Sequence, residues 1–189
     1  MNTLREYLED MDDPRSNTFV EIYDDLKDLF HEAKGSSYNH QAWKGGYADH
    51  IAETFRINEA TYDALESIRR LPFTKDSAMI CLFLHDIEKP FRYVNNASAL
   101  KWRNILGLKN ADELTYHEWE DAKWHIITYL KFQYRFLLSD EEINALKYTH
   151  GEGDDHQKER RVAGPLAAHV HHCDNASARI WFDEGKGLS

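Results

Sequence analysis

The sequence has no apolar stretch long enough to cross a bilayer, and its 189 residues include only two cysteines, Cys81 and Cys173. No CxxC pair occurs, so nothing indicates a zinc knuckle. Because both cysteines fall in segments that favour helix, we expect buried, reduced thiols instead of a disulfide framework. The acidic N-terminal residues contain no hydrophobic signal segment, so we expect a cytoplasmic protein with no membrane partner.

Positive charge is also scarce, because 23 lysines and arginines stand against 33 aspartates and glutamates, a formal net charge of −10. Sequence-independent binding to long nucleic acid needs a basic face, so we expect no such partner. A small anionic substrate is still compatible with this charge, since a bound cation and a few lysines can reverse the local field. The high count of eleven histidines directs attention to metal chemistry.

Signals for β-strands are weak. The sequence shows no sustained apolar–polar alternation and no Asn-Gly or Asp-Gly turns between β-branched runs. Helical spacing of apolar residues predominates, and the capping box Ser139-Asp-Glu-Glu142 predicts a helix start. We predict an all-α single domain over residues 1–189, with an N-terminal helical extension (1–44) before a core (45–182). The predicted helices cover 17–34, 46–69, a segment from Thr74 that carries 82–86, then 100–106, 115–138, 140–150 and 165–181.

The dipeptide His85-Asp86 is the most informative feature of the chain. It follows seven consecutive apolar residues, 78–84, and precedes Lys89 and Pro90, where we expect the segment to end. Buried ionisable groups are costly unless they are paired or coordinated. An imidazole beside a carboxylate can hold a divalent metal ion. The alternative interpretation is a buried, salt-bridged pair without a metal.

Other residues able to bind metal are placed on helices or at helix ends. His50 lies on the second predicted helix, His117 opens the long one, and His150 ends the helix that follows the capping box. Asp174 lies within the last predicted helix between small residues, which is an unusual surface choice. We expect His31, His40 and His156 to lie in loops or on the surface.

These residues and their neighbours resemble the HD-domain superfamily of metal-dependent phosphohydrolases. The segment Gly45-Gly-Tyr-Ala-Asp-His50 is similar to the family's first-histidine segment, and His85-Asp-Ile-Glu-Lys89 to its His-Asp-Ile-Gly-Lys run. The closing Asp174-Asn-Ala-Ser-Ala resembles the family's late aspartate. The resemblance covers roughly residues 45–182. Glu88 stands where the family commonly has glycine, and Gly151 where a second histidine often follows.

The resemblance implies a helical bundle of the HD type with a metal site in its core. A first metal would take His50, His85, Asp86 and Asp174. Asp86 has two oxygens, so it could bridge to a second metal held by His117 and His150. With one metal only, His117 and His150 would contact phosphate or transfer protons instead.

Imidazoles and carboxylates together suit one or two ions of Mn, Fe, Co, Ni or Zn, whereas Mg is compatible but less well matched. Such an ion activates water and polarises a phosphoryl oxygen. Lys89 could supply positive charge to a phosphate. Glu53 and Glu118 are candidates for activating water or for supporting a ligand from behind.

The resemblance therefore implies hydrolysis of a phosphate ester or anhydride of a small substrate. A nucleoside mono- or triphosphate is the expected one, and Tyr93, Trp43 and Trp102 are candidate rings for stacking on a nucleobase. The alternatives are a phosphodiesterase for cyclic or oligomeric nucleotides, a di-iron oxygenase with a similar site, and a non-catalytic module that binds metal and nucleotide. A homo-oligomer is compatible with the sequence.

Overall fold

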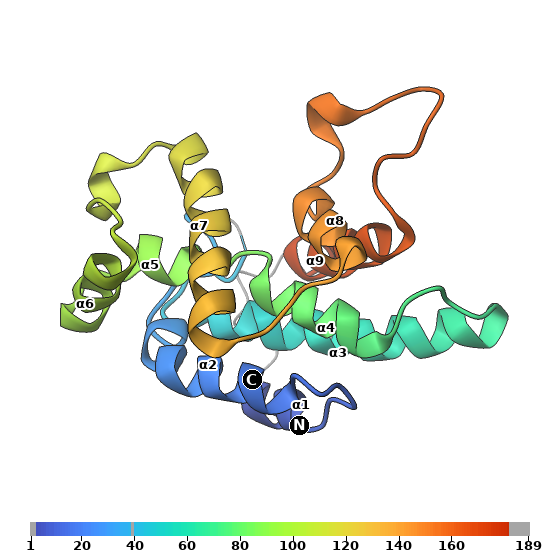
Figure 1. Ribbon diagram of the computed structural model, residues 1–189, viewed down its shortest axis with the longest axis horizontal. Helices are drawn as coiled ribbons and strands as arrows, with labels where there is room; N and C mark the ends of the chain where they lie inside the picture. The colour runs from blue at the N-terminus through green and yellow to red at the C-terminus, as the bar shows by residue number, and fades with distance from the viewer. Residues whose placement is uncertain (1–2, 39, 182–189) are drawn as a thin grey trace.

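The computed structural model describes residues 3–38 and 40–181. Within them the chain folds into nine α-helices and two short 3-10 helices, with no β-strand beyond an isolated bridge between Gln157 and Arg160 (Figure 1). The all-α prediction is therefore confirmed. The elements are α1 (Leu4–Glu9), α2 (Ser16–Phe30), α3 (Gly46–Ile68), α4 (Lys75–Leu84), α5 (Lys89–Tyr93), α6 (Ala97–Leu106), η1 (Ala111–Glu113), α7 (Tyr116–Tyr134), α8 (Asp140–Tyr148), η2 (Gly153–Asp155) and α9 (Pro165–Arg179).

Several helix ends follow capping residues in the sequence. The predicted capping box of α8 forms, because Ser139 and Glu142 bond reciprocally to each other's backbone amides. Thr74 accepts from the amide of Ser77 and starts α4. Gly107 ends α6 in the left-handed conformation, with φ of 64°, where the absence of Cβ avoids strain.

Several predicted boundaries were wrong, among them the start of α6, which lies at Ala97 and not at residue 100. Helix α2 ends at Phe30 and not at residue 34, and α7 ends at Tyr134 and not at residue 138. Pro90 does not end a segment but lies in the first turn of the short helix α5, where its missing amide proton costs nothing.

Helix α4 forms the centre of the fold. All seven of its apolar residues from 78 to 84 are buried, with α3, α8 and α9 packed around them. Helices α1 and α2, drawn in blue, lie along one side of α3 and α4, while α5, α6 and α7 gather at one end (Figure 1). One continuous cluster of buried apolar residues runs from Leu4 to Cys173, so the predicted extension shares its core with the rest of the chain.

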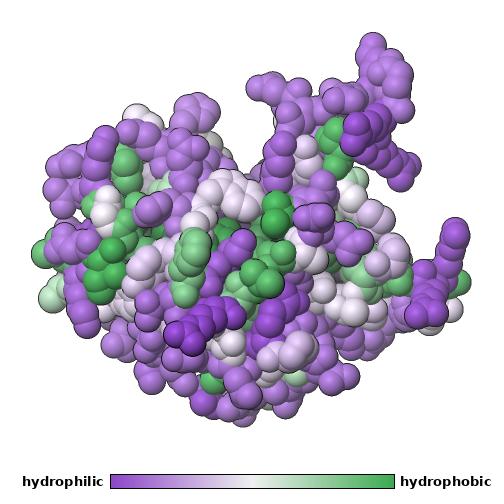
Figure 2. Space-filling view, in the orientation of Figure 1, coloured by the Kyte–Doolittle hydropathy of each residue, from purple (hydrophilic) through white to green (hydrophobic). Residues whose placement is uncertain are grey.

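Cys81 and Cys173 are buried free thiols, as predicted. None of the described helices is both long and apolar enough to cross a membrane. The connection between α8 and α9 projects from the body, and Figure 2 shows that its surface is mostly hydrophilic.

Arg15, just before α2, links the N-terminal helices to α8. Its guanidinium donates to both carboxylate oxygens of Glu142 at 2.8 Å, to Asp13, and to the carbonyl of Leu137 at 2.9 Å. The side chain of Glu142 is only 1% exposed, so this bidentate pair is largely removed from water.

Candidate metal centre

Three helices deliver four metal-capable side chains to one point in the core. His50 comes from the second turn of α3, and Asp174 from the middle of α9. Helix α4 ends at Leu84, with His85 as its C-cap and Asp86 directly after it. Because the buried apolar residues of α4 fix its position, the chain end that they anchor carries both ionisable residues into the core.

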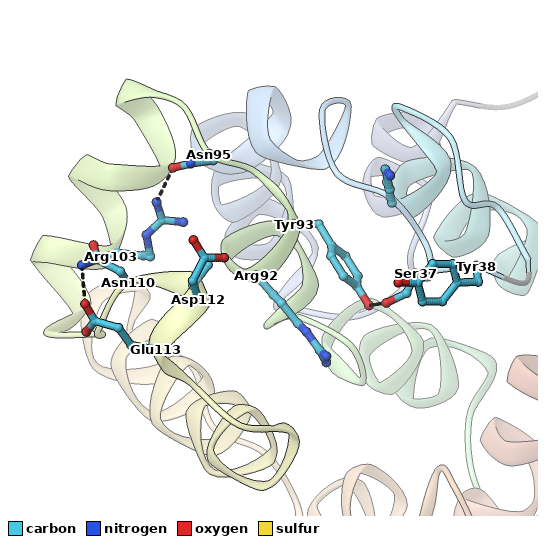
Figure 3. Close-up of a pocket in the computed structure, with 11 residues that line it drawn as sticks. Ser37, Tyr38, Arg92, Tyr93, Asn95, Arg103, Asn110, Asp112 and Glu113 are labelled. Carbon is cyan, nitrogen blue, oxygen red and sulfur yellow. Dashed lines mark hydrogen bonds between the residues drawn. The ribbon is translucent and has the colours of Figure 1, made fainter.

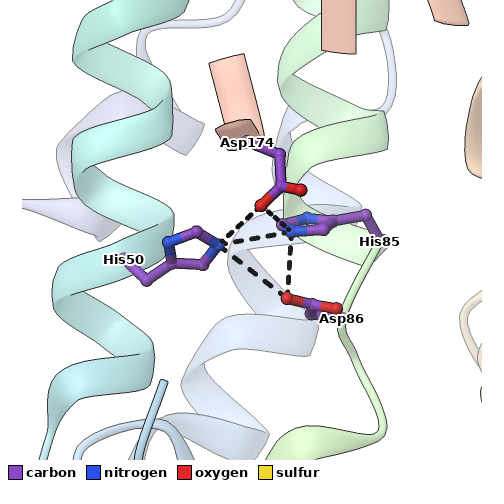
Figure 4. A group of neighbouring side chains, drawn as sticks. All are labelled: His50, His85, Asp86 and Asp174. Atoms are coloured by element: carbon purple, nitrogen blue, oxygen red, sulfur yellow. Dashed lines mark hydrogen bonds and ion pairs between the residues drawn. The ribbon is translucent and has the colours of Figure 1, made fainter. Parts of the chain in front are cut away.

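The four side chains point at one another (Figure 4). His85 Nε2 lies 3.1 Å from Asp86 Oδ2, and His50 Nε2 lies 3.3 Å from Asp174 Oδ1. The two Nε2 atoms are 3.4 Å apart, and each also faces the other carboxylate at 3.5–3.8 Å. One ligand atom from each residue falls within 4.8 Å of all the others, so these four residues could hold a metal ion.

Hydrogen bonds on the far side of both imidazoles direct Nε2 toward this group. His85 Nδ1 lies 2.7 Å from the carbonyl of Leu82, which can only accept, so Nδ1 carries the proton. His50 Nδ1 lies 3.0 Å from Ser177 Oγ, which donates to Glu53 Oε2 at 2.6 Å. The hydroxyl therefore accepts from His50. This arrangement leaves the Nε2 lone pairs for a metal, as outer hydrogen bonds do in known metal sites.

Both carboxylates stay ionised near neutral pH. Burial alone would raise the pKa of Asp86, but His85 and Lys89 beside it hold that pKa well below its usual range. The pKa of Asp174 is also lowered, because its close contacts with His50 and His85 outweigh burial. Burial lowers the pKa of His85, yet the two carboxylates prevail and raise it to about 10. Metal binding here would displace that proton, as is general for histidine ligands.

Lys89 and His150 stand beside the four residues. Lys89 Nζ lies 2.5 Å from Asp86 Oδ2, which brings a positive charge to the edge of the group. His150 Nε2 lies 3.6 Å from Asp86 Oδ1 and 3.8 Å from Asp174 Oδ2, and its side chain is 45% exposed. Each carboxylate thus turns one oxygen toward His50 and the other toward His150.

Two of the other predicted residues lie in the first turn of α7. His117 is exposed there and is not among the four grouped residues. Glu118 accepts from the Thr115 amide and hydroxyl, both at 2.8 Å, and pairs with Lys109 at 3.3 Å. These bonds lower the pKa of Glu118 to about 2. Its carboxylate therefore caps α7, which is a structural role that the prediction did not include.

His40, which we expected in a loop or on the surface, lies in a loop that reaches the site. The ring of His40 lies 5.5 Å from the ring of His50, and burial lowers the pKa of His40 to about 4. The neighbouring Gln41 has a left-handed backbone, with φ of 44°, and donates to Glu53 at 2.8 Å. A Cβ on Gly46 would lie 1.9 Å from the Gln41 carbonyl oxygen, so glycine at this position permits the loop to approach α3.

Further ionisable groups lie behind Asp86 and were not found from the sequence. Glu88 is buried, and burial and Asp86 together raise its pKa to about 7. Lys123 of α7 is 4% exposed and opposes this shift in pKa. Among the described residues, Glu88 Oε2 and the hydroxyl of Tyr47 are buried without a hydrogen-bond partner. In the sequence, the one signal for the burial of Lys123 is that this charged residue stands between the apolar Ala122 and Trp124.

The structure thus brings together His50, His85, Asp86 and Asp174, places Lys89 and His150 in contact with them, and links Glu53 to them through Ser177. Ser177 was not singled out as a site residue, although it lies three positions after Asp174 and hence on the same face of α9. No protein-family model, curated protein or solved structure significantly matches the chain. The chemistry of the site therefore has to indicate what the protein does.

Proposed function

We propose that the protein is a metal-dependent phosphohydrolase of the HD-domain type that acts on a small phosphate ester or anhydride, with a nucleotide as the substrate. The observation that carries this proposal is the buried group of two imidazoles and two carboxylates, with both Nε2 atoms directed inward. The order of these residues along the chain is that of the family described above. A lysine at the edge of the group adds the positive charge that an anionic substrate requires.

The donor set fits a divalent ion of the Mn, Fe, Co, Ni or Zn class. His50, His85, Asp86 and Asp174 would hold it, and when bound it would lower the pKa of a water molecule and polarise a phosphoryl oxygen. The second oxygens of Asp86 and Asp174 both face His150. This geometry supports His150 as a ligand of a second ion or as a contact to phosphate.

The protein's own residues have distinct roles in the proposed reaction. Lys89 would bind a phosphate oxygen, and its ion pair with Asp86 holds the ammonium beside the reacting group. Glu53 orients His50 through the Ser177 hydroxyl. His150 is half-exposed and lies at the outer edge of the group, which suits proton transfer to a departing oxygen.

Phosphate release from nucleoside mono- and triphosphates, dinucleotides and p-nitrophenyl phosphate, each with Mn, Co, Ni, Zn and Mg, tests this proposal. Wild-type protein is expected to release phosphate only with a divalent ion. Asp86→Asn preserves the shape of the side chain but removes its charge, so activity and metal content should both fall to background while helicity is retained. Asp10→Asn, at an exposed position in the N-terminal region, is the matched control and should change neither.

Retention of full activity and metal content by Asp86→Asn would show that the site is wrong. Oxygen consumption by iron-loaded protein without phosphate release would favour an oxygenase. Binding of metal and nucleotide with no turnover of any substrate would favour a non-catalytic module.

A further inference from the structure

A polar cleft of about 590 Å³ lies at the end of the molecule formed by α5, α6 and η1. Tyr93 and Arg92 of α5 line it together with Tyr38, Asp112 and Glu113 (Figure 3). None of these residues belongs to the metal centre. The cleft therefore needs an explanation of its own.

Two chain segments connect the cleft with the metal centre. The loop that lines the cleft at Tyr38 places His40 against His50 two residues later. Along α5, Lys89 contacts Asp86, whereas the residues three and four positions later line the cleft. Positions i, i+3 and i+4 share one helix face, so Arg92 and Tyr93 of the cleft lie about one helical turn, or ~5.4 Å along the axis, from Lys89. A substrate with its phosphate at Lys89 would extend its remaining part toward the cleft.

The cleft is held in shape by buried hydrogen bonds. Arg103 is 3% exposed and donates to the carbonyls of Phe91 and Val94 at 2.9 Å, which fixes the end of α5 against α6. The hydroxyl of Tyr93 lies 3.0 Å from Ser37 Oγ, which ties the loop to α5. A site organised in this way before binding loses less entropy when a ligand arrives.

The cleft carries charged side chains of both signs, which suits a polar ligand without net charge. Asp112 and Glu113 are carboxylates on η1, whereas Arg92 and Lys34 contribute positive charge. A second phosphate would meet the carboxylates, and a cation would meet the guanidinium and the ammonium. Tyr38 is 91% exposed, so its ring is free to stack on a planar group. A nucleobase is planar and uncharged and carries both hydrogen-bond donors and acceptors at its edge.

Asp112 gives the cleft a preference among bases. Glu113 Oε1 already accepts from Asn110 at 2.9 Å. Asp112, in contrast, makes no hydrogen bond or ion pair with any residue that the structure describes. A carboxylate accepts well from an exocyclic amino group, such as N4 of cytosine, but has no donor to meet at the corresponding oxygen of uracil.

We infer that this cleft binds the base of the substrate, with the ring on Tyr38 and Tyr93 and an exocyclic amino group on Asp112. Cytosine, adenine and guanine nucleotides are then preferred over those of uracil and thymine. This inference rests on the proposed function, because it assigns the cleft to the same substrate whose phosphate meets Lys89.

Binding of cytidine and uridine to the full-length protein, measured by calorimetry or NMR, tests the cleft without any hydrolysis. The two nucleosides lack phosphate and differ at the group that Asp112 would contact. We expect wild-type protein to bind cytidine about tenfold more tightly than uridine, the effect of one hydrogen bond to a charged group. Asp112→Asn should bring this ratio close to one, and Tyr38→Ala should weaken both nucleosides. Asp10→Asn is the control of equal charge change and should keep the ratio.

Both substituted positions are exposed, so the variants are expected to fold. A wild-type ratio near one, an unchanged ratio in Asp112→Asn, or no binding of either nucleoside would overturn the inference. Nucleoside selectivity without phosphate release would overturn only the proposed function. Phosphate release without nucleoside selectivity would overturn only the assignment of the cleft.

Discussion

Removal of the Ser177 hydroxyl should weaken metal binding although Ser177 is not a ligand. The hydroxyl accepts from His50 Nδ1 at 3.0 Å and donates to Glu53 Oε2 at 2.6 Å, and the side chain is fully buried. In Ser177→Ala the imidazole loses the bond that fixes its tautomer and orientation. Glu53 retains its bond from Gln41 at 2.8 Å, so the uncompensated loss falls mainly on His50.

Loss of such an outer hydrogen bond typically reduces metal affinity about 10–100-fold, or about 1.4–2.7 kcal/mol. A buried N–H without a partner also destabilises the folded state by about 1–3 kcal/mol. Titration with Co²⁺, followed by its visible absorption, measures the affinity and reports the coordination geometry. Urea denaturation of the same variant measures stability.

The exposed Ser67 on the same helix as His50 provides a control, because its hydroxyl donates to the Ala64 carbonyl at 2.7 Å, away from the metal centre. Ser67→Ala should bind Co²⁺ as wild-type protein does. Glu53→Gln should have a smaller effect than Ser177→Ala, since an amide can still accept from the serine. Unchanged Co²⁺ affinity in Ser177→Ala would refute the assignment of His50 Nε2 as a ligand held from behind by Ser177.

Two further predictions concern stability. Arg15→Ala leaves the Glu142 carboxylate buried without its bidentate partner and should lower the free energy of unfolding in urea by about 3 kcal/mol. The control Arg5→Ala breaks exposed ion pairs and should lower it by less than about 1 kcal/mol. Equal losses in the two variants would contradict a special role for the Arg15–Glu142 pair. Burial lowers the pKa of His169 to about 4, so its folded form stays neutral while the unfolded chain takes up a proton. The contribution of His169 to the free energy of unfolding is then fully present above pH 6.5, and about 3 kcal/mol of it is lost as the pH falls toward 4. His169→Gln should remove this loss. Identical curves of stability against pH for the variant and the wild-type protein would exclude the role of His169.

The helices that the sequence predicted well are those whose ends depend on local chemistry. Capping by Thr74 and Ser139 and the left-handed Gly107 involve only neighbouring residues. Helix α2, in contrast, ends before residue 34 because the backbone after Phe30 bonds to residues that are distant in the sequence. The carbonyl of Ala33 accepts from the Tyr47 amide at 3.1 Å, and the chain has already turned there. No periodicity in residues 17–34 indicates that contact.

The end of α7 has a similar tertiary cause. Arg135 adopts a left-handed backbone conformation, with φ of 56°. The chain turns there, and the ring of Phe136 packs on that of Phe19 with 5.1 Å between the ring centroids. A non-glycine residue in this conformation is uncommon, so the sequence favoured a longer helix.

Most of the core of the candidate site has a local signal in the sequence, whereas His50 was singled out by the family resemblance. His85-Asp86 follows a buried run, and Asp174 interrupts a row of small residues. His40 has no such signal, since only the fold of the loop at Gln41 and Gly46 places it beside His50. Glu118 has a local role that the prediction did not include, because its carboxylate caps the first turn of α7.

The four candidate ligands lie far apart in the sequence, from His50 to Asp174, and two of the three helices that carry them are the long α3 and the late α9. An ion held by all four residues would join His50 to Asp174 and so close a loop that contains most of the chain. A disulfide restricts the unfolded chain of other proteins in the same way. The two cysteines are buried free thiols, so such an ion would act as a cross-link in place of a disulfide between them. Because the unfolded chain cannot assemble these ligands, metal concentration would set part of the folding equilibrium. Supply of the ion would then govern which fraction of the protein is folded.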